Sequence, residues 1–395
     1  MRAHHRRLRA WLLLIPVLLA ALGIGGWQML RERQARWREQ AGQYQAWAAA
    51  EKDWILSCQL DSGLILYTQW DGEAPREEQT VTPYFSGLAA LGLLSGTVTQ
   101  EQLQGAERFL LWYLNHLNTA QEDPINGDGT VFDQLAIREG ETIRVEPKVG
   151  RYDSVDSYAA ILLLLADRYG QVAGPSLLEA RRADILRVLD ALLRTLEENG
   201  LSHAKAEYPV QYLMDNCEVY AALGAAPRLL EILDAGGSRL EAVNQARSQL
   251  GQAIENILWN ETLERYETGI LTGKPLDSDG WDSFYPDSAA QLFPLCFGVL
   301  EPDDGRARAL YEDFCGAWSW ETLEHQHSGE STFAWCVTAY AAALLEDEER
   351  LSQFIQAYHT QLEERGRGYP LYTGDAGWMA LACGHMEEIY QNKFW

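Results

Sequence analysis

The fold is decided by the stretch RYDSVDSYAAILLLLA, residues 151–166, in which a polar loop runs into a strongly apolar segment. Ser and Asp suit the first turn of a helix because their side chains accept hydrogen bonds from unpaired backbone N–H groups. The segment that follows is apolar nearly all round, which predicts a helix buried on every side. Asp153 and Asp156 stand at the mouth of this helix. Tyr152 and Tyr158 flank the two acids. The acids are either part of a functional site or only an N-terminal cap of this helix.

The same contrast repeats along the chain, where segments with one apolar stripe alternate with segments that are apolar all round. Strand signals are weak. The expected helices cover residues 40–58, 83–94, 100–117, 151–169, 176–198, 212–233, 239–259, 285–300, 303–318, 331–345, 348–364 and 375–390. A regular alternation of this kind indicates an internal repeat, and two concentric rings of helices satisfy it. The sequence therefore predicts an all-α fold, an (α/α)6 toroid of six helical hairpins.

The loops indicate which end of this toroid carries the function. Connections from an outer helix to the next inner one are long at residues 118–150, 199–211 and 260–284, whereas the opposite connections are short. Long loops in a compact domain usually carry function. The inner helices present their N-termini at this same end, so we expect the site there.

The N-terminus is a separate unit. Residues 1–9 form a basic tail, residues 10–30 carry no charge and are long enough to span a bilayer, and residues 31–39 form a second basic segment. We expect a single transmembrane signal anchor at 10–30, with a cleaved signal peptide as the alternative. The toroid domain would then cover residues 40–395. Four Arg lie on each side of the span, so the charge bias does not predict which end faces the cytoplasm.

The composition excludes several partners. Beyond residue 40 the chain has 24 basic and 55 acidic residues, a net charge of −31, which argues against nucleic acid. The six Cys form no CxxC pair and no zinc pattern with His, so we expect no metal and no cofactor. We expect a monomer.

Carboxylates stand near the starts of five of the six inner helices, and aromatic residues accompany them. The acids are Asp153 with Asp156, Asp215 with Glu218, Asp287, Glu330 and Asp375. Aromatic rings stack on sugar faces, acids accept hydroxyl hydrogen bonds, and a carboxylate pair can cleave a glycosidic bond. Each acid could instead be a cap on its own helix. We predict catalysis by Asp153, Asp156 and Asp215, and substrate contacts from Tyr84, Asp133, Tyr152, Tyr158, Lys205, Trp281, Tyr285, Asp287, Glu330 and Trp378.

These motifs resemble the six-hairpin glycosidase superfamily. The stretch at 152–166 is similar to the second acidic motif of family 8 glycoside hydrolases, and Met214-Asp215-Asn216 is similar to an inner-helix start of unsaturated glucuronyl hydrolases. The resemblance covers roughly residues 50–392. One departure is that family 8 enzymes place a catalytic Glu before the first inner helix, whereas residues 81–87 contain no acid. The family 8 mechanism therefore does not carry over whole.

The resemblance implies a glycoside hydrolase that acts on an oligo- or polysaccharide. With the expected anchor at 10–30, we predict that it is held in the cell membrane with the toroid on the extracytoplasmic side. The alternative is a non-catalytic carbohydrate-binding or envelope polysaccharide assembly protein on the same toroid. A lyase, epimerase or cyclase is a further possibility. Epimerases of this architecture rely on His, however, and the His residues here have no obvious pairing at the helix mouths.

Overall fold

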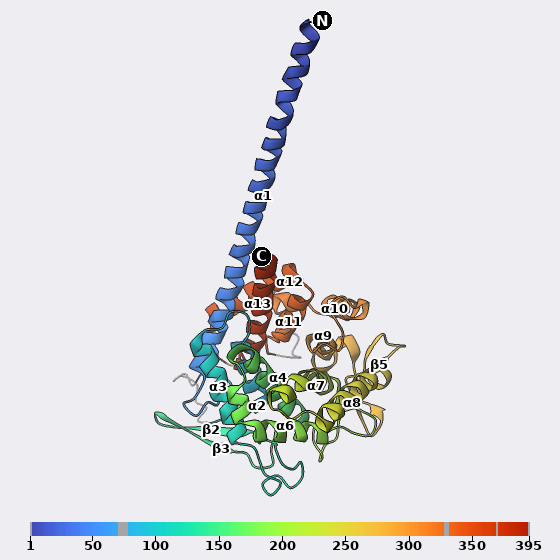
Figure 1. Ribbon diagram of the computed structural model, residues 1–395. Coiled ribbons are helices and arrows are strands. Elements are labelled where there is room, and N and C mark those ends of the chain that lie inside the picture. Colours follow the sequence, from blue (N-terminus) through green and yellow to red (C-terminus); the bar gives the residue numbers. More distant parts are fainter. Residues whose placement is uncertain (1, 70–77, 328–331, 369, 394–395) are drawn as a thin grey trace.

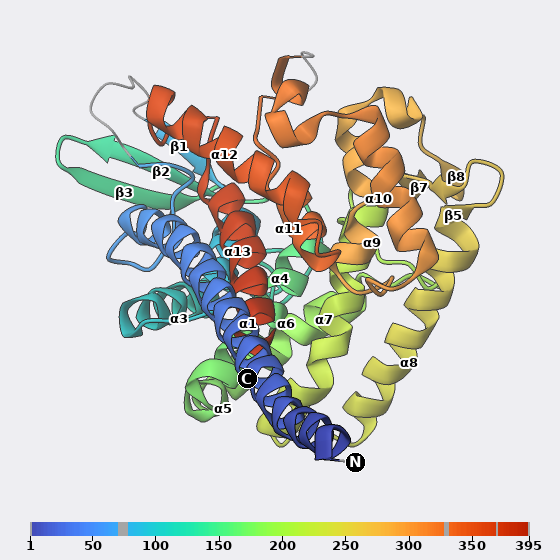
Figure 2. The same ribbon diagram turned by 90° about the horizontal axis from the view of Figure 1, so that it is seen from above.

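The computed structural model describes residues 2–69, 78–327, 332–368 and 370–393, with side chains for residue 27 and from residue 29 onward. Its architecture is two rings of helices (Figures 1 and 2). The inner ring consists of α2 (Pro83–Leu93), α4 (Val155–Ala173), α7 (Leu213–Ile232), α9 (Phe293–Cys296), α11 (Val337–Leu344) and α13 (Thr373–Lys393). The outer ring consists of the last part of α1 (Arg2–Ser57), α3 (Gln100–Asn115), α5 with α6 (Ser176–Ala180, Arg182–Arg194), α8 (Ser238–Ala253), α10 (Gly305–Ala317) and α12 (Glu348–Arg365). The prediction of six helical hairpins is confirmed.

The inner ring closes on itself. Along the chain each inner helix packs against the next, and the last one, α13, packs against the first, α2. Glycine makes this closing contact possible, since a Cβ on Gly92 would lie only 2.6 Å from the Cα of Gly377. In a closed ring of six, α7 and α13 are three places apart and therefore face each other across the central axis.

The buried stretch that decides the fold behaves as predicted at its N-terminus. Helix α4 begins at Val155 with Ser154 as its N-cap and Asp156 in its first turn. Its residues from Val155 to Leu163 are all buried, in agreement with a helix that is apolar all round.

Two predicted inner helices are shorter than expected. Residues 284–288 form a separate π-helical turn before α9, and α11 starts at Val337 rather than near residue 331. Pro286 and Pro294 lack the backbone N–H that a continuous helix over 285–300 would use. Trp335 has a left-handed φ of 57°, which is incompatible with an α-helix at that residue.

The long loops contain strands that the apolar pattern did not predict. The strands β1 (Glu78–Val81), β2 (Gln134–Glu139) and β3 (Thr142–Pro147) form an antiparallel sheet in that order. Smaller pairings join β4 (Gln211–Tyr212), β7 (Gly269–Leu271) and β8 (Lys274–Pro275), and β5 (Trp259–Asn260) to β6 (Arg265–Tyr266). The β2–β3 hairpin lies at the opposite end of the toroid from the extension of α1 (Figure 1).

The predicted membrane span falls within α1, which runs as one helix and projects away from the toroid (Figure 1). Within the described parts of the chain, no helix meets both the length and the apolarity that a bilayer crossing requires. Side chains at 10–26 lie outside the description, so the anchor stays a prediction.

Candidate active site

A cavity of about 490 Å³ opens between the N-terminal ends of the inner helices, at the end where the site was expected. Four carboxylates line it: Asp153 directly before α4, Asp215 and Glu218 on α7, and Asp375 on α13. Asp215 and Glu218 are three residues apart, which places them on one face of the helix. Among the described residues that line this cavity there is no Lys, Arg or His.

Glu218 is held in a setting that favours its protonated form. Its side chain is 1% exposed, and Oε1 accepts a hydrogen bond of 2.5 Å from the hydroxyl of Tyr84 on α2. Oε2 is buried without a hydrogen-bond partner among the described residues. Burial, followed by the charge of Asp215, raises the pKa of Glu218 well above its usual value. A carboxyl group of this kind is a source of a proton.

Asp375 occupies a different electrostatic setting on the facing helix. It is also 1% exposed, but Oδ1 accepts a 2.8 Å hydrogen bond from the backbone N–H of Cys336, the N-cap of α11. Oδ2 is buried and has no hydrogen-bond partner in the described part of the chain. Burial raises the pKa of Asp375 to about 7, while hydrogen bonds from backbone N–H groups favour its charged form. Asp375 can therefore act as a base near neutral pH.

Asp215 and Asp153 complete the acidic lining. Burial, and then the charges of Asp156 and Asp153, raise the pKa of Asp215 well above its usual value. Asp153 is exposed and stands nearer to solvent than the other three acids. Asp215 lies close enough to Glu218 for its charge to raise the pKa of Glu218, so these two buried acids of α7 do not both ionise easily.

Aromatic side chains form much of the remaining wall. Phe85 and Tyr372 meet edge to face at 5.0 Å, and Tyr67 packs beside both. Tyr285 is 45% exposed and lies 4.6 Å from the ring of Trp335. Exposed and partly exposed rings beside acids suit a ligand that has both an apolar face and hydroxyl groups.

Five of the predicted site residues line this cavity: Tyr84, Asp153, Asp215, Tyr285 and Trp378. Asp156, by contrast, lies outside the lining and bonds within the first turn of its own helix. Asp156 is 0% exposed and does not line the cavity; its carboxylate accepts from the backbone N–H of Ser157 (2.9 Å) and the hydroxyl of Ser202 (2.7 Å).

A second group of predicted residues belongs to a network outside the cavity lining. Tyr158 donates to Asp133 at 2.7 Å, and the Tyr152 hydroxyl donates to Asp123 at 3.1 Å. Lys205 donates to the backbone carbonyl of Tyr152 at 2.7 Å. These contacts tie the 118–150 and 199–211 loops to the start of α4, so their direct role is to position the mouth of that helix.

The remaining predictions fall elsewhere. Asp287 is buried and accepts from Thr268 at 2.6 Å and from the backbone N–H of Asp279 at 3.2 Å, away from the cavity lining. Trp281 lies in a short 3-10 helix and does not line the cavity. Glu330 lies outside the described residues.

Glu218 and Asp375 stand at predicted helix mouths but were not selected for the site from the sequence. The spacing of Glu218, three residues after Asp215 on an apolar helix, is the signal that could have selected it. Nothing local to the sequence marks Asp375, because its importance comes from facing α7 across the ring. Tyr67, Phe85 and Tyr372 were likewise not among the selected residues.

Fold and site together define an (α/α)6 toroid with an acidic, aromatic-walled cavity at one end. No protein-family model and no curated protein sequence matches the chain. Several solved structures share the fold. A wild-type glycosidase aligns with a TM-score of 0.59 at 13% identity over 90% of this chain and 98% of its own.

Two further structures are similar. An α-amylase from Clostridium perfringens aligns with a TM-score of 0.53 at 12% identity over 85% of this chain and 97% of its own. The mannosylglycerate hydrolase of family GH63 from Thermus thermophilus, in complex with glucose, aligns with a TM-score of 0.53 at 13% identity. The alignment covers 85% of this chain and 98% of that hydrolase. The chain therefore has the fold of the six-hairpin glycosidases, as the resemblance implied. A specific relation to family 8 stays a prediction.

Proposed function

We propose that this protein is a glycoside hydrolase acting on an oligo- or polysaccharide, with Glu218 as the general acid and Asp375 as the general base. One observation carries the proposal. Each of these residues lines the cavity and has one buried carboxyl oxygen without a hydrogen-bond partner among the described residues. The two lie on helices that face each other across the ring. Burial and the charge of Asp215 favour a proton on Glu218, whereas Asp375, whose pKa burial raises to about 7, is partly ionised near neutral pH.

The reaction follows from this arrangement. Glu218 protonates the glycosidic oxygen as the bond to the anomeric carbon breaks. Asp375 takes a proton from a water molecule that attacks the anomeric carbon from the other face of the sugar. We propose that this water lies between the two carboxyl groups, as in inverting glycosidases, and that the product therefore forms with inverted anomeric configuration.

The predicted residues keep roles in this scheme. Asp215 helps to hold the proton on Glu218, since its nearby charge raises the pKa of that group. Asp153 and Asp215 accept hydrogen bonds from sugar hydroxyls, and Tyr84, Tyr285 and Trp378 contact the sugar. The known activities of the similar structures support a carbohydrate as the substrate class.

The test is hydrolysis of a panel of linear oligosaccharides by purified wild-type protein, Glu218→Gln and Asp375→Asn. Loss of a general acid or base typically lowers the rate 10²- to 10⁴-fold, so we expect about 10³-fold in each variant. Asp287→Asn is the matched control, because it changes a buried acid outside the cavity lining, and it should retain wild-type activity. ¹H NMR of the first product identifies the anomer. Binding of sugar by the wild type without any Glu218-dependent turnover would favour the non-catalytic alternative.

We also propose that residues 10–30 anchor the protein, with the toroid on the extracytoplasmic side of the cell membrane. The uncharged run at 10–30 supports an anchor. Helix α1 extends from the toroid on the side opposite to the β2–β3 hairpin (Figure 1). With residues 10–30 in the bilayer, the end of the toroid that carries the long loops and the cavity would face away from the membrane. Membrane fractionation with protease treatment of intact cells tests both points, and a soluble, protease-protected product would contradict them.

A further inference from the structure

We infer that Trp378 closes the inner end of the cavity and restricts the enzyme to the ends of sugar chains. The inference rests on the proposed function, since it concerns how a polysaccharide enters the same site. The toroid has a cavity at each end of its inner helices, and the side chain of Trp378 lies between the two cavities.

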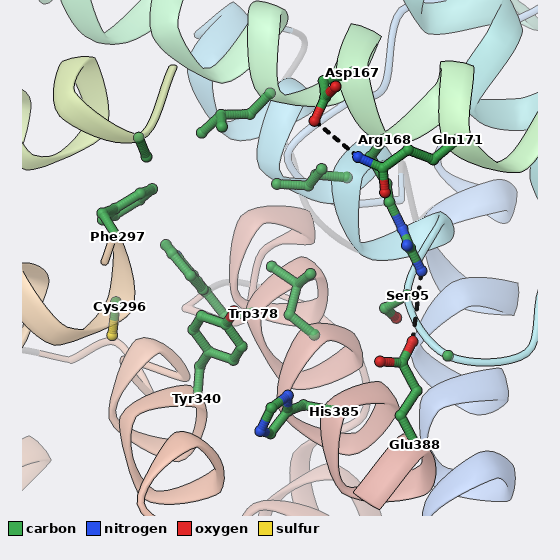
Figure 3. A pocket seen from close by; sticks show the side chains of 15 residues that line it. Ser95, Asp167, Arg168, Gln171, Cys296, Phe297, Tyr340, Trp378, His385 and Glu388 are labelled. Carbon is green, nitrogen blue, oxygen red and sulfur yellow. Dashed lines mark hydrogen bonds and ion pairs between the residues drawn. The ribbon is translucent and has the colours of Figure 1, made fainter. Parts of the chain in front are cut away.

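The second hollow is a cavity of about 340 Å³ at the other end of the inner helices (Figure 3). Leu164, Arg168, Tyr340 and His385 are among the residues around it. Arg168 and Glu388 form a 3.5 Å ion pair at this cavity (Figure 3). Trp378 lines this second cavity and the acidic one alike.

Trp378 is held firmly in this position. It is 5% exposed, and its ring meets Phe297 edge to face at 5.8 Å. Tyr340 packs on it at 5.5 Å (Figure 3). Phe297 and Tyr340 line the second cavity but not the acidic one, so the indole of Trp378 is the side chain that stands between the two cavities.

The depth of Glu218 and Asp375 in the cavity determines which glycosidic bonds can reach them. Asp375 precedes Trp378 by three residues of α13, so the indole lies only about 4.5 Å further along the helix axis. Glu218 and Asp375 are each 1% exposed. The scissile bond must therefore be brought below the mouth of the cavity. On one side of that bond the sugar meets Trp378, which leaves space for a terminal unit and none for a continuing chain.

The experiment uses the full-length wild-type protein and linear gluco- and manno-hexasaccharides labelled at the reducing end. For whichever hexasaccharide is cleaved, we expect the labelled chain to shorten by one unit at a time, with the pentasaccharide as the first labelled product. Simultaneous appearance of labelled di-, tri- and tetrasaccharides at early times would overturn the inference. If that internal cleavage still depends on Glu218, the proposed function survives and only the chain-end restriction fails.

A pair of variants tests the role of the indole itself. Trp378→Ala joins the two cavities, so we expect the share of disaccharide released to rise at least tenfold. Tyr340→Phe is the control, because it keeps the ring that packs on Trp378 and lies outside the acidic cavity, and its products should equal those of the wild type. A folded Trp378→Ala variant, as judged by circular dichroism, that releases only single sugars would overturn the assignment of Trp378 as the barrier.

Discussion

The hydroxyl of Tyr84 on α2 donates a 2.5 Å hydrogen bond to Oε1 of Glu218 on α7, so the first and third inner helices meet at the proposed general acid. The hydrogen bond favours the ionised form of Glu218, against the larger effects of burial and of Asp215. Tyr84 thereby limits how strongly the acid holds its proton.

Tyr84→Phe should shift the alkaline limb of the pH profile. Without the phenol donor the pKa of Glu218 rises further, and the acid stays protonated to higher pH. A hydrogen bond to a charged group is worth about 1.5–3 kcal/mol, so kcat/KM should begin to decline about one to two pH units later than in the wild type. Tyr169→Phe is the control, because its hydroxyl donates to Glu107 on α3 and neither residue lines the cavity. A limb that moves to lower pH would exclude this role for Tyr84.

We expect the ionisation of Asp375 to determine the acidic limb of the pH profile of kcat/KM. Burial raises its pKa to about 7, and a general base must be ionised, so kcat/KM should fall as the pH drops through about 7. In Asp375→Asn this limb should disappear from the residual activity. Added azide should restore consumption of substrate as a glycosyl azide, because azide needs no base to become a nucleophile. An unchanged acidic limb in this variant would assign the limb to another group.

The stability of the protein should decrease as the pH rises from about 4 to about 7. Burial raises the pKa of Asp156 to about 7, so the folded state binds a proton that the unfolded state has already lost in this range. Below pH about 4, Asp156 is protonated in both the folded and the unfolded state, so the full stability is present. As the pH rises toward about 7, only the unfolded state loses the proton freely, and the free energy of unfolding falls. At about 1.4 kcal/mol per unit of pKa difference, the effect is on the order of 4 kcal/mol.

Asp156→Asn should weaken this pH dependence without abolishing it, because Asp215, Glu218 and Asp375 also have raised pKa values. Urea titrations at pH 4.5 and 8 would measure it, with a smaller difference between the two free energies of unfolding in the variant. Asp313→Asn, on the outer helix α10, serves as the control at an exposed acid. An equal pH dependence in Asp156→Asn and the wild type would show that other groups are responsible.

The charge of the cavity should exclude anionic sugars. Four carboxylates and no cation line it among the described residues, so a uronate ring would meet repulsion without a partner. Neutral glycosides should be hydrolysed at least tenfold faster, in kcat/KM, than the matching glycosiduronates. Asp153→Asn should narrow this ratio, because Asp153 is the exposed acid at the mouth. Preference of the wild type for a uronide would contradict the prediction, and would favour the resemblance to glucuronyl hydrolases instead.

Arg367→Met should destabilise the fold where α1 packs against α12. Arg367 forms two 2.7 Å hydrogen bonds to Glu51, which is 0% exposed and also accepts from Tyr358. Removing one partner of a buried ion pair leaves an uncompensated charge and costs about 3–5 kcal/mol. Arg144→Met is the control at an exposed pair, where we expect less than about 1 kcal/mol. Urea denaturation compares the two, and equal losses would argue against a dominant role for burial.

Much of the fold follows from the sequence, because the periodicity of apolar residues is a local property. The contrast between α4, apolar all round, and α6, with its single stripe, is enough to predict an inner and an outer ring. The β2–β3 hairpin was missed although Ile143 and Val145 alternate with polar residues there. Two short strands in a long loop give a weak signal beside twelve helices.

The sequence by itself determined that acids and aromatic residues would gather at the N-terminal ends of the inner helices, since chain order and loop length place those ends together. It did not determine which acids would share a cavity. Asp153 and Asp156 are equivalent in sequence, yet Asp153 lies exposed in the loop before α4 and Asp156 is buried in its first turn beside Ser202. Glu218 and Asp375 are 157 positions apart along the chain, and only the closure of the ring sets them face to face. Burial, which shifts their pKa values, depends on every helix around them and is therefore a property of the tertiary structure alone.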